Sequence, residues 1–400
     1  MPSITENKQG LKVLITGSIL QLFLGIIYVW SVFKNPVSAY FGWEPSAVGL
    51  TANFMLCFFV IGILAGGKAQ VKIGVKFTTL IGGLMVAVGM LATALIPSGG
   101  NAPVFLIYLF YGIIGGFGVG AGYNAIISTA QKWFPQNRGF ATGVSVCAFG
   151  FSTVLFAPLV TMLNKNLPVN YTFLILAGGF TAAVLLLFSF IKSPEQVPNA
   201  AAPVLKGKQY TTLEMLKTPR FYLIALSLMF GTSVFFIINP NLKDLANERG
   251  LESFATMIVM FTGIANALGR LGAPLMSDKI GREMADVIIL AVTALGAFGL
   301  CFASGILLIV IIAAVAFCYG GYSGLYPVLT STNFGIKNIG SNYGAVMVGF
   351  MLSALLFPIV IKKIDDQQLK FIVLGALAAV GAVLVVILRL MNLKQAKEES

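Results

Sequence analysis

The chain has 400 residues, of which 58% are hydrophobic and only 10% are charged. A soluble domain carries about 25% charged residues, so this composition excludes a set of water-soluble domains and indicates a protein surrounded mostly by lipid. The formal net charge of +12 does not indicate a nucleic-acid partner, because the basic residues form short clusters between apolar segments instead of a patch or stripe.

Twelve apolar segments are long enough to cross a bilayer, since a helix needs about 20 residues to span the hydrocarbon core. In chain order we predict helices at 11–33, 47–67, 75–95, 104–130, 138–161, 171–191, 220–240, 253–273, 284–303, 306–331, 338–361 and 368–391. The first segment reaches Phe33 without a small-residue cleavage site, so we interpret it as a helix and not as a signal peptide. The predicted fold class is all-α, a polytopic membrane protein with twelve transmembrane helices.

The distribution of basic residues predicts the orientation. With the N-terminus inside, 18 of the 26 Lys and Arg residues fall in cytoplasmic segments, seven fall outside and Arg270 lies within a span. Because cytoplasmic loops are enriched in Lys and Arg, we expect a multi-pass protein of the plasma or inner membrane with both termini in the cytoplasm.

The longest polar stretch, 192–219, divides the chain into two halves of six spans, and we predict domains at 1–191 and 220–400 with a cytoplasmic linker between them. The halves share a motif. Lys72-Ile-Gly after the second span aligns with Lys279-Ile-Gly after the eighth, with Val71 in place of Asp278. A six-span repeat of about 200 residues is typical of alternating-access transporters.

Arg270 is the one charged residue predicted in the interior of a span, away from its ends. It lies about 10 Å along the helix from Ser277, where an arginine costs about 2.5–3.5 kcal/mol on insertion scales. The sequence places no acid in the interior of a span, and the nearest is Asp286 at the start of the ninth. A water-filled cavity with an anionic ligand would offset this cost, and the planar guanidinium suits a carboxylate. The alternative is an arginine that binds helix-end carbonyls or extends to the interface.

Polar side chains at helical spacing are expected to orient such a ligand by hydrogen bonds from both halves of the chain. The candidates are Gln21 and Tyr28 on the first span, Tyr123 on the fourth, Asn266 on the eighth, and Tyr322 and Tyr326 on the tenth. For each tyrosine the alternative is an interfacial or core aromatic residue with a satisfied hydroxyl.

The gate motif Gly272–Arg282 resembles the cytoplasmic gate motif of the major facilitator superfamily. Four further stretches resemble its branch of oxalate/formate antiporters and prokaryotic monocarboxylate transporters: Gln21–Phe33, Lys132–Gly139, Asn266–Arg270 and Asn342–Gly344. The resemblance implies two six-helix halves related by a pseudo-two-fold axis. It also implies substrate contacts at Tyr28 and Tyr123, and a cytoplasmic gate formed by Asp278, Lys279 and Arg282.

Two departures from the resemblance narrow the expected activity. Animal-type proton-coupled relatives carry an aspartate where this chain has Asn266, so a carboxylate proton relay is not expected, and no other buried acid or histidine is expected to replace it. Oxalate exchangers carry a second cation at the position of Phe350. One cation balances one carboxylate, so we expect a monocarboxylate of the formate, acetate, lactate or pyruvate class, with an oxalate-type dicarboxylate exchanger as the alternative.

Other classes of protein fit less well. A sugar or drug carrier of the same fold would line its cavity with amides or keep a buried acid, and a sensor would need an effector domain. An enzyme would need histidines, buried carboxylates or metal ligands, and the chain has no histidine. We therefore expect no enzymatic activity, no cofactor and no metal. The expected partners are a small organic anion, carried by antiport or symport, and the lipid bilayer, and by analogy the protein is a monomer.

Overall fold

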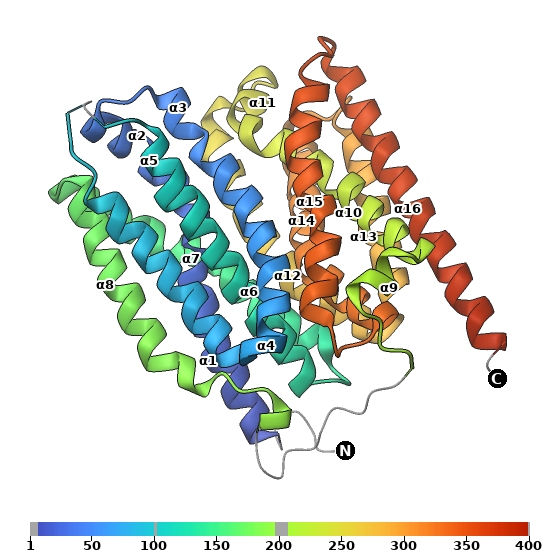
Figure 1. The fold of residues 1–400 in the computed structure, drawn as a ribbon. Helices are drawn as coiled ribbons and strands as arrows, with labels where there is room; N and C mark the ends of the chain where they lie inside the picture. The colour runs from blue at the N-terminus through green and yellow to red at the C-terminus, as the bar shows by residue number, and fades with distance from the viewer. Residues whose placement is uncertain (1–6, 100–101, 197–206, 399–400) are drawn as a thin grey trace. The chain divides into compact units, whose positions relative to one another are not determined.

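The computed structural model describes residues 7–99, 102–196 and 207–398, and its regular elements there are helices (Figure 1). Within these residues, ten helical segments are long and apolar enough to cross a membrane. One of them, Pro45–Ala94, holds two spans. The eighteen-residue α13 (Arg282–Gly299) carries three charged residues in its first five and supplies the remaining span. The twelve predicted spans are therefore all helical.

The helices of the first half follow the apolar segments closely. Their bounds are α1 Lys8–Leu24, a 3-10 turn Gly25–Val29, α2 Trp30–Phe41, α3 Pro45–Gly49, α4 Thr51–Ala94, α5 Phe105–Ile107, a π-helical stretch Tyr108–Gly115, α6 Gly116–Trp133, α7 Arg138–Asn166 and α8 Val169–Leu187. The first span extends beyond its predicted end at residue 33, because Val37 and Phe41 bury their side chains and continue the helix past Pro36.

The second half contains α9 Thr212–Leu216, α10 Pro219–Ile238, α11 Leu242–Glu248, α12 Ala255–Ile280, α13, α14 Gly305–Phe334, α15 Ile339–Ile361 and α16 Gln367–Glu398. Thr211 and Glu214 form a capping box before α9, and the backbone N–H of Thr211 holds the pKa of Glu214 below its usual range. Residues 197–206 of the predicted linker lie outside the described residues.

The chain forms two compact units. The first contains the described residues within 1–136, 148–206 and 336–345, and the second contains those within 137–147, 207–335 and 346–400. The start of α7 therefore belongs to the second unit, and the start of α15 belongs to the first. The domain boundaries at 191 and 220 remain predictions from the sequence.

Glycine allows the closest helix contact in the second unit, between α12 and α14. A Cβ atom on Gly269 would collide with the carbonyl oxygen of Phe317, and one on Gly320 would collide with the carbonyl oxygen of Asn266. Small residues let two helix backbones approach in this way. This contact fixes the turn of α12 that carries Asn266 and Arg270.

Candidate anion-binding site

Arg270 is buried in the second unit, with 3% of its surface exposed. Its Nε donates a hydrogen bond to Oδ1 of Asn266 at 2.9 Å, and its Nη1 lies 3.5 Å from the carbonyl oxygen of Val146 at the start of α7. The second contact is of the kind that the alternative interpretation of Arg270 expects, but it is at the long limit for a hydrogen bond. Both acceptors are neutral, so these two contacts orient the guanidinium without balancing its charge.

Tyr322 and Tyr326 are fully buried in the same unit. The hydroxyl of Tyr322 hydrogen-bonds to Oγ1 of Thr293 on α13 at 2.8 Å, and the hydroxyl of Tyr326 hydrogen-bonds to Oγ of Ser227 on α10 at 2.9 Å. These bonds tie α14 to its neighbours. The arrangement matches the core-aromatic alternative for both tyrosines.

The candidates of the first unit lie together around Phe149. The rings of Tyr28 and Tyr123 pack on this phenylalanine with centroid distances of 5.3 and 4.8 Å. Nε2 of Gln21 donates to the carbonyl oxygen of Tyr123 at 3.2 Å. Gln21 and Tyr123 are buried, whereas Tyr28 is 39% exposed. Tyr28 is therefore the most accessible of these three side chains.

Phe350, at the position where oxalate exchangers carry a lysine, belongs to an aromatic cluster of the second unit. Its ring lies 5.1 Å from that of Phe236 and 6.2 Å from that of Tyr319, centroid to centroid. This position therefore holds an apolar, well-packed side chain that adds no positive charge.

Asp286 corrects one expectation from the sequence, because this acid is fully buried. Neither carboxylate oxygen has a partner at hydrogen-bonding geometry in the described structure, and the Tyr326 side chain lies beside it. The signal is present in the sequence: Asp286, Ile289, Leu290 and Thr293 share one helical face, and all four are buried. The expectation that the chain has no buried acid was therefore wrong.

In the gate motif, Asp278 connects the end of α12 to the start of α7. Its carboxylate accepts hydrogen bonds from the backbone N–H of Gly139 at 3.2 Å and of Phe140 at 2.9 Å, and pairs with Arg282 at 2.5 Å. Arg282 also donates to Oγ of Ser277 at 2.6 Å. A carboxylate at a helix N-terminus satisfies free amides and the helix dipole. Lys279 is exposed and lies outside this cluster.

Comparison with known proteins assigns the fold. The family model described as Major Facilitator Superfamily matches residues 15–358. The uncharacterized MFS-type transporter YhjX of Escherichia coli is 28% identical over 86% of this chain and 85% of its own length. The oxalate:formate antiporter of Oxalobacter formigenes is 29% identical over 80% of this chain and 76% of its own length. The proton:xylose symporter XylE of E. coli superposes with a TM-score of 0.68 at 16% identity, over 94% of this chain and 95% of XylE.

Proposed function

We propose that this chain, which belongs to the Major Facilitator Superfamily and is a secondary transporter of the membrane, carries small organic monocarboxylate anions by alternating access. The substrate class is that of formate, acetate, lactate and pyruvate. The similarity to the oxalate:formate antiporter of Oxalobacter formigenes, which is 29% identical to this chain, supports an organic-anion substrate.

The single observation that carries the proposal is the buried guanidinium of Arg270. Burial strengthens charge-assisted hydrogen bonds, and a guanidinium binds both oxygens of a carboxylate through two parallel N–H groups. Asn266 accepts from Nε and so sets the plane of the group. In this proposal Arg270 binds the carboxylate and Asn266 positions Arg270.

The proposal assigns the remaining candidates to substrate contact, to support of a helix, or to the gate. In the first unit, Tyr28, Tyr123 and Gln21 are proposed substrate contacts. In the second unit, Tyr322 and Tyr326 support α14 through their hydrogen-bonded hydroxyls and are secondary candidates. Asp278 and Arg282 are proposed gate residues because they join two helix ends, and Lys279 is a gate candidate from the motif alone.

A dicarboxylate exchanger is the second candidate function, favoured by the similarity to the oxalate:formate antiporter. The aromatic surroundings of Phe350 argue against it. A divalent oxalate would keep one uncompensated charge in a site that contains a single arginine, and unpaired charge is expensive to hold away from water. Monocarboxylates therefore remain the preferred substrates.

The test is uptake into proteoliposomes that contain the purified protein. Labelled formate, acetate, lactate, pyruvate and oxalate are offered separately, with and without unlabelled anion inside and with and without an imposed pH gradient. We expect saturable uptake of at least one monocarboxylate, and its loss in Arg270→Lys.

The matched control is Arg249→Lys, because Arg249 donates to the carbonyl oxygens of Leu300 and Ala303 at a loop. Oxalate exchange without monocarboxylate uptake would contradict the preferred substrate class, and no uptake of any of the five anions would contradict the proposal.

A further inference from the structure

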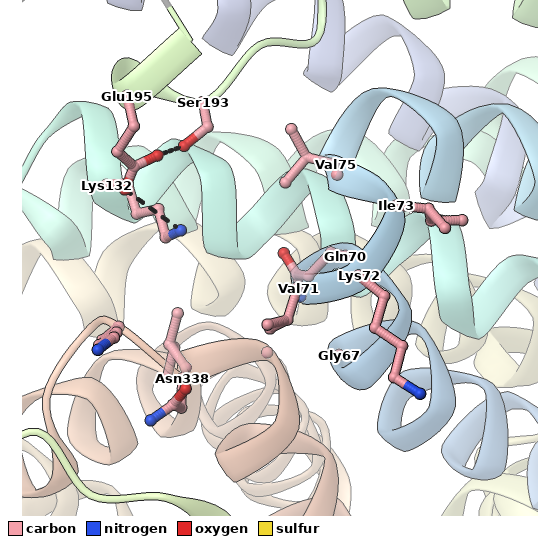
Figure 2. A pocket seen from close by; sticks show the side chains of 14 residues that line it. Gly67, Gln70, Val71, Lys72, Ile73, Val75, Lys132, Ser193, Glu195 and Asn338 are labelled. Atoms are coloured by element: carbon pink, nitrogen blue, oxygen red, sulfur yellow. Dashed lines mark hydrogen bonds and ion pairs between the residues drawn. The ribbon is translucent and has the colours of Figure 1, made fainter.

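A basic cavity of about 540 Å³ lies in the first unit (Figure 2). It is bounded by the middle of α4, the end of α6, the segment after α8 and the start of α15. Among the described residues, the charged side chains that line it are three lysines, Lys72, Lys132 and Lys337, and one acid, Glu195. Glu195 pairs with Lys132 at 3.5 Å, so the lining keeps a net charge of about +2.

The cavity lies at the first copy of the repeated motif. Gly74 and Gly281, which end the two copies, have φ/ψ of 80°/160° and 94°/153°. These nearly equal values lie in a region that only glycine adopts easily. The two glycines therefore have the same backbone conformation, which supports the alignment of the motif after the second span with the motif after the eighth. Val71 then corresponds to Asp278.

The helix starts that face the two motifs are equivalent as well. Asn137-Arg-Gly139 begins α7, and Asn338-Ile-Gly340 begins α15. Gly139 packs against the carbonyl oxygen of Pro274, and Gly340 packs against Gly67, at the matching place of the first motif. The backbone amides of Gly340 and Ser341 are therefore the counterparts of the amides that Asp278 accepts from.

At the first motif the carboxylate is missing. Val71 lines the cavity and is 68% exposed, although its counterpart Asp278 binds two amides and an arginine. Figure 2 shows Val71 and Gln70 on one side of the cavity, with Asn338 below and the Lys132–Glu195 pair across from them. Lysines therefore line the cavity beside the position where the second unit holds a bound carboxylate.

Gln70 gives a separate indication of a ligand. Its Oε1 accepts a hydrogen bond from Oγ of Ser128 at 2.7 Å, which leaves the amide group facing the start of α15. Nε2 is inaccessible to solvent and has no acceptor within the described residues. A buried donor without an acceptor costs about 1–3 kcal/mol, and rotation of the Gln70 amide toward an oxyanion in the cavity would relieve that cost.

We propose that this cavity binds a phosphate group, as a free anion or as a lipid headgroup, in place of the carboxylate that Val71 lacks. A free phosphate carries a charge of about −1.5 to −2 at neutral pH, which matches the net charge of the described lining, and the phosphodiester of a lipid headgroup carries one negative charge and would balance about half of it. Its oxygens can accept from lysine ammonium groups and from the Gln70 amide together. The ligand would stabilise the first unit at the start of α15, as Asp278 stabilises the second unit at the start of α7.

The first experiment is thermal unfolding of the detergent-solubilised full chain in inorganic phosphate and in sodium chloride of equal ionic strength. We expect phosphate to raise the unfolding midpoint by about 2 °C or more at saturation. Val71→Asp should raise the midpoint in chloride and remove the phosphate effect, because its own carboxylate fills the position. Val71→Asn, of the same shape without the charge, should keep the phosphate effect. Lys337→Gln should weaken the phosphate effect.

The second experiment distinguishes the two sources of phosphate. The chain is placed in nanodiscs of phosphatidylcholine alone or with phosphatidylglycerol, in a phosphate-free buffer. Stabilisation by phosphatidylglycerol that Val71→Asp abolishes assigns a lipid headgroup, whereas stabilisation only by dissolved phosphate assigns a free anion.

If neither source stabilises the wild type, or if Val71→Asp responds as the wild type does, the proposal is overturned. Arg270→Lys should keep the full phosphate effect, so this site and the proposed transport function can fail independently.

Discussion

Nε of Arg270 donates to Oδ1 of Asn266 at 2.9 Å, and the two residues lie one turn apart on α12. This bond occupies one edge of the guanidinium with an acceptor that carries no charge. An aspartate at position 266 would make the same bond as an ion pair. The amide therefore leaves more of the positive charge of Arg270 for a bound anion.

Replacing Arg270 by lysine should lower the affinity for the monocarboxylate by roughly 10–100-fold, although the charge is kept. A lysine ammonium is a point charge that cannot present two parallel N–H groups to a carboxylate. The measurement is anion-induced thermal stabilisation of the purified variant, with Arg249→Lys as the control. An unchanged anion affinity in Arg270→Lys would remove Arg270 from the site.

Asn266→Asp should make anion binding depend on pH. Its carboxylate would pair with Arg270 and compete with the substrate, and protonation of that carboxylate would end the competition. The variant should therefore bind the anion more tightly as the pH falls from 8 to 5, while Asn266→Gln shows no comparable change. The measurement is the apparent Kd over this pH range, and a pH response equal to that of the wild type would contradict the positioning role of Asn266.

The sequence predicts those features that depend on one helix at a time. Span length and apolar content predict the helices, and the four-residue spacing predicts that Asn266 and Arg270 share a face. The gate motif can be recognised in both halves because each copy ends at a glycine, and in the structure both glycines have a positive φ.

Features that depend on several helices are not predictable in this way. The partners of the Tyr322 and Tyr326 hydroxyls come from α13 and α10, and no spacing along α14 specifies them. The helical face that Asp286 shares with Ile289 and Thr293 can be read from the sequence, but the depth of its burial depends on which neighbours cover the first turns of α13. The sequence shows that position 71 holds a valine where the second motif has Asp278. Only the structure shows what that carboxylate binds, namely two backbone amides at the start of α7.

Gly269→Ala should destabilise the second unit and lower anion affinity together. Its Cβ atom would meet the carbonyl oxygen of Phe317, and backbone cannot move aside as a flexible side chain can, so α12 must shift away from α14. Overpacking of this kind costs about 1–3 kcal/mol. The control is Gly263→Ala on the same helix, where a Cβ atom meets nothing within 4 Å. Unfolding midpoints and anion affinities of the two variants are compared, and equal behaviour would show that the close approach of α12 and α14 does not hold Arg270 in place.

Asp278→Asn should slow transport more than it weakens substrate binding. The variant keeps the shape of the side chain but loses the charge that pairs with Arg282 and complements the N-terminus of α7. Loss of a helix cap and a charge-assisted hydrogen bond costs about 1–3 kcal/mol. This loss falls on the state in which the two helix ends are joined, and Arg270 is untouched. Lys279→Gln is compared with it, because Lys279 is a gate candidate from the motif alone and, being exposed, should change the turnover rate less than Asp278 does. The measurement is the maximal uptake rate in proteoliposomes beside the anion affinity in detergent. A wild-type rate in Asp278→Asn would rule out a gating role for this carboxylate, and an equal loss in Lys279→Gln would assign the effect to loop charge instead of the cap.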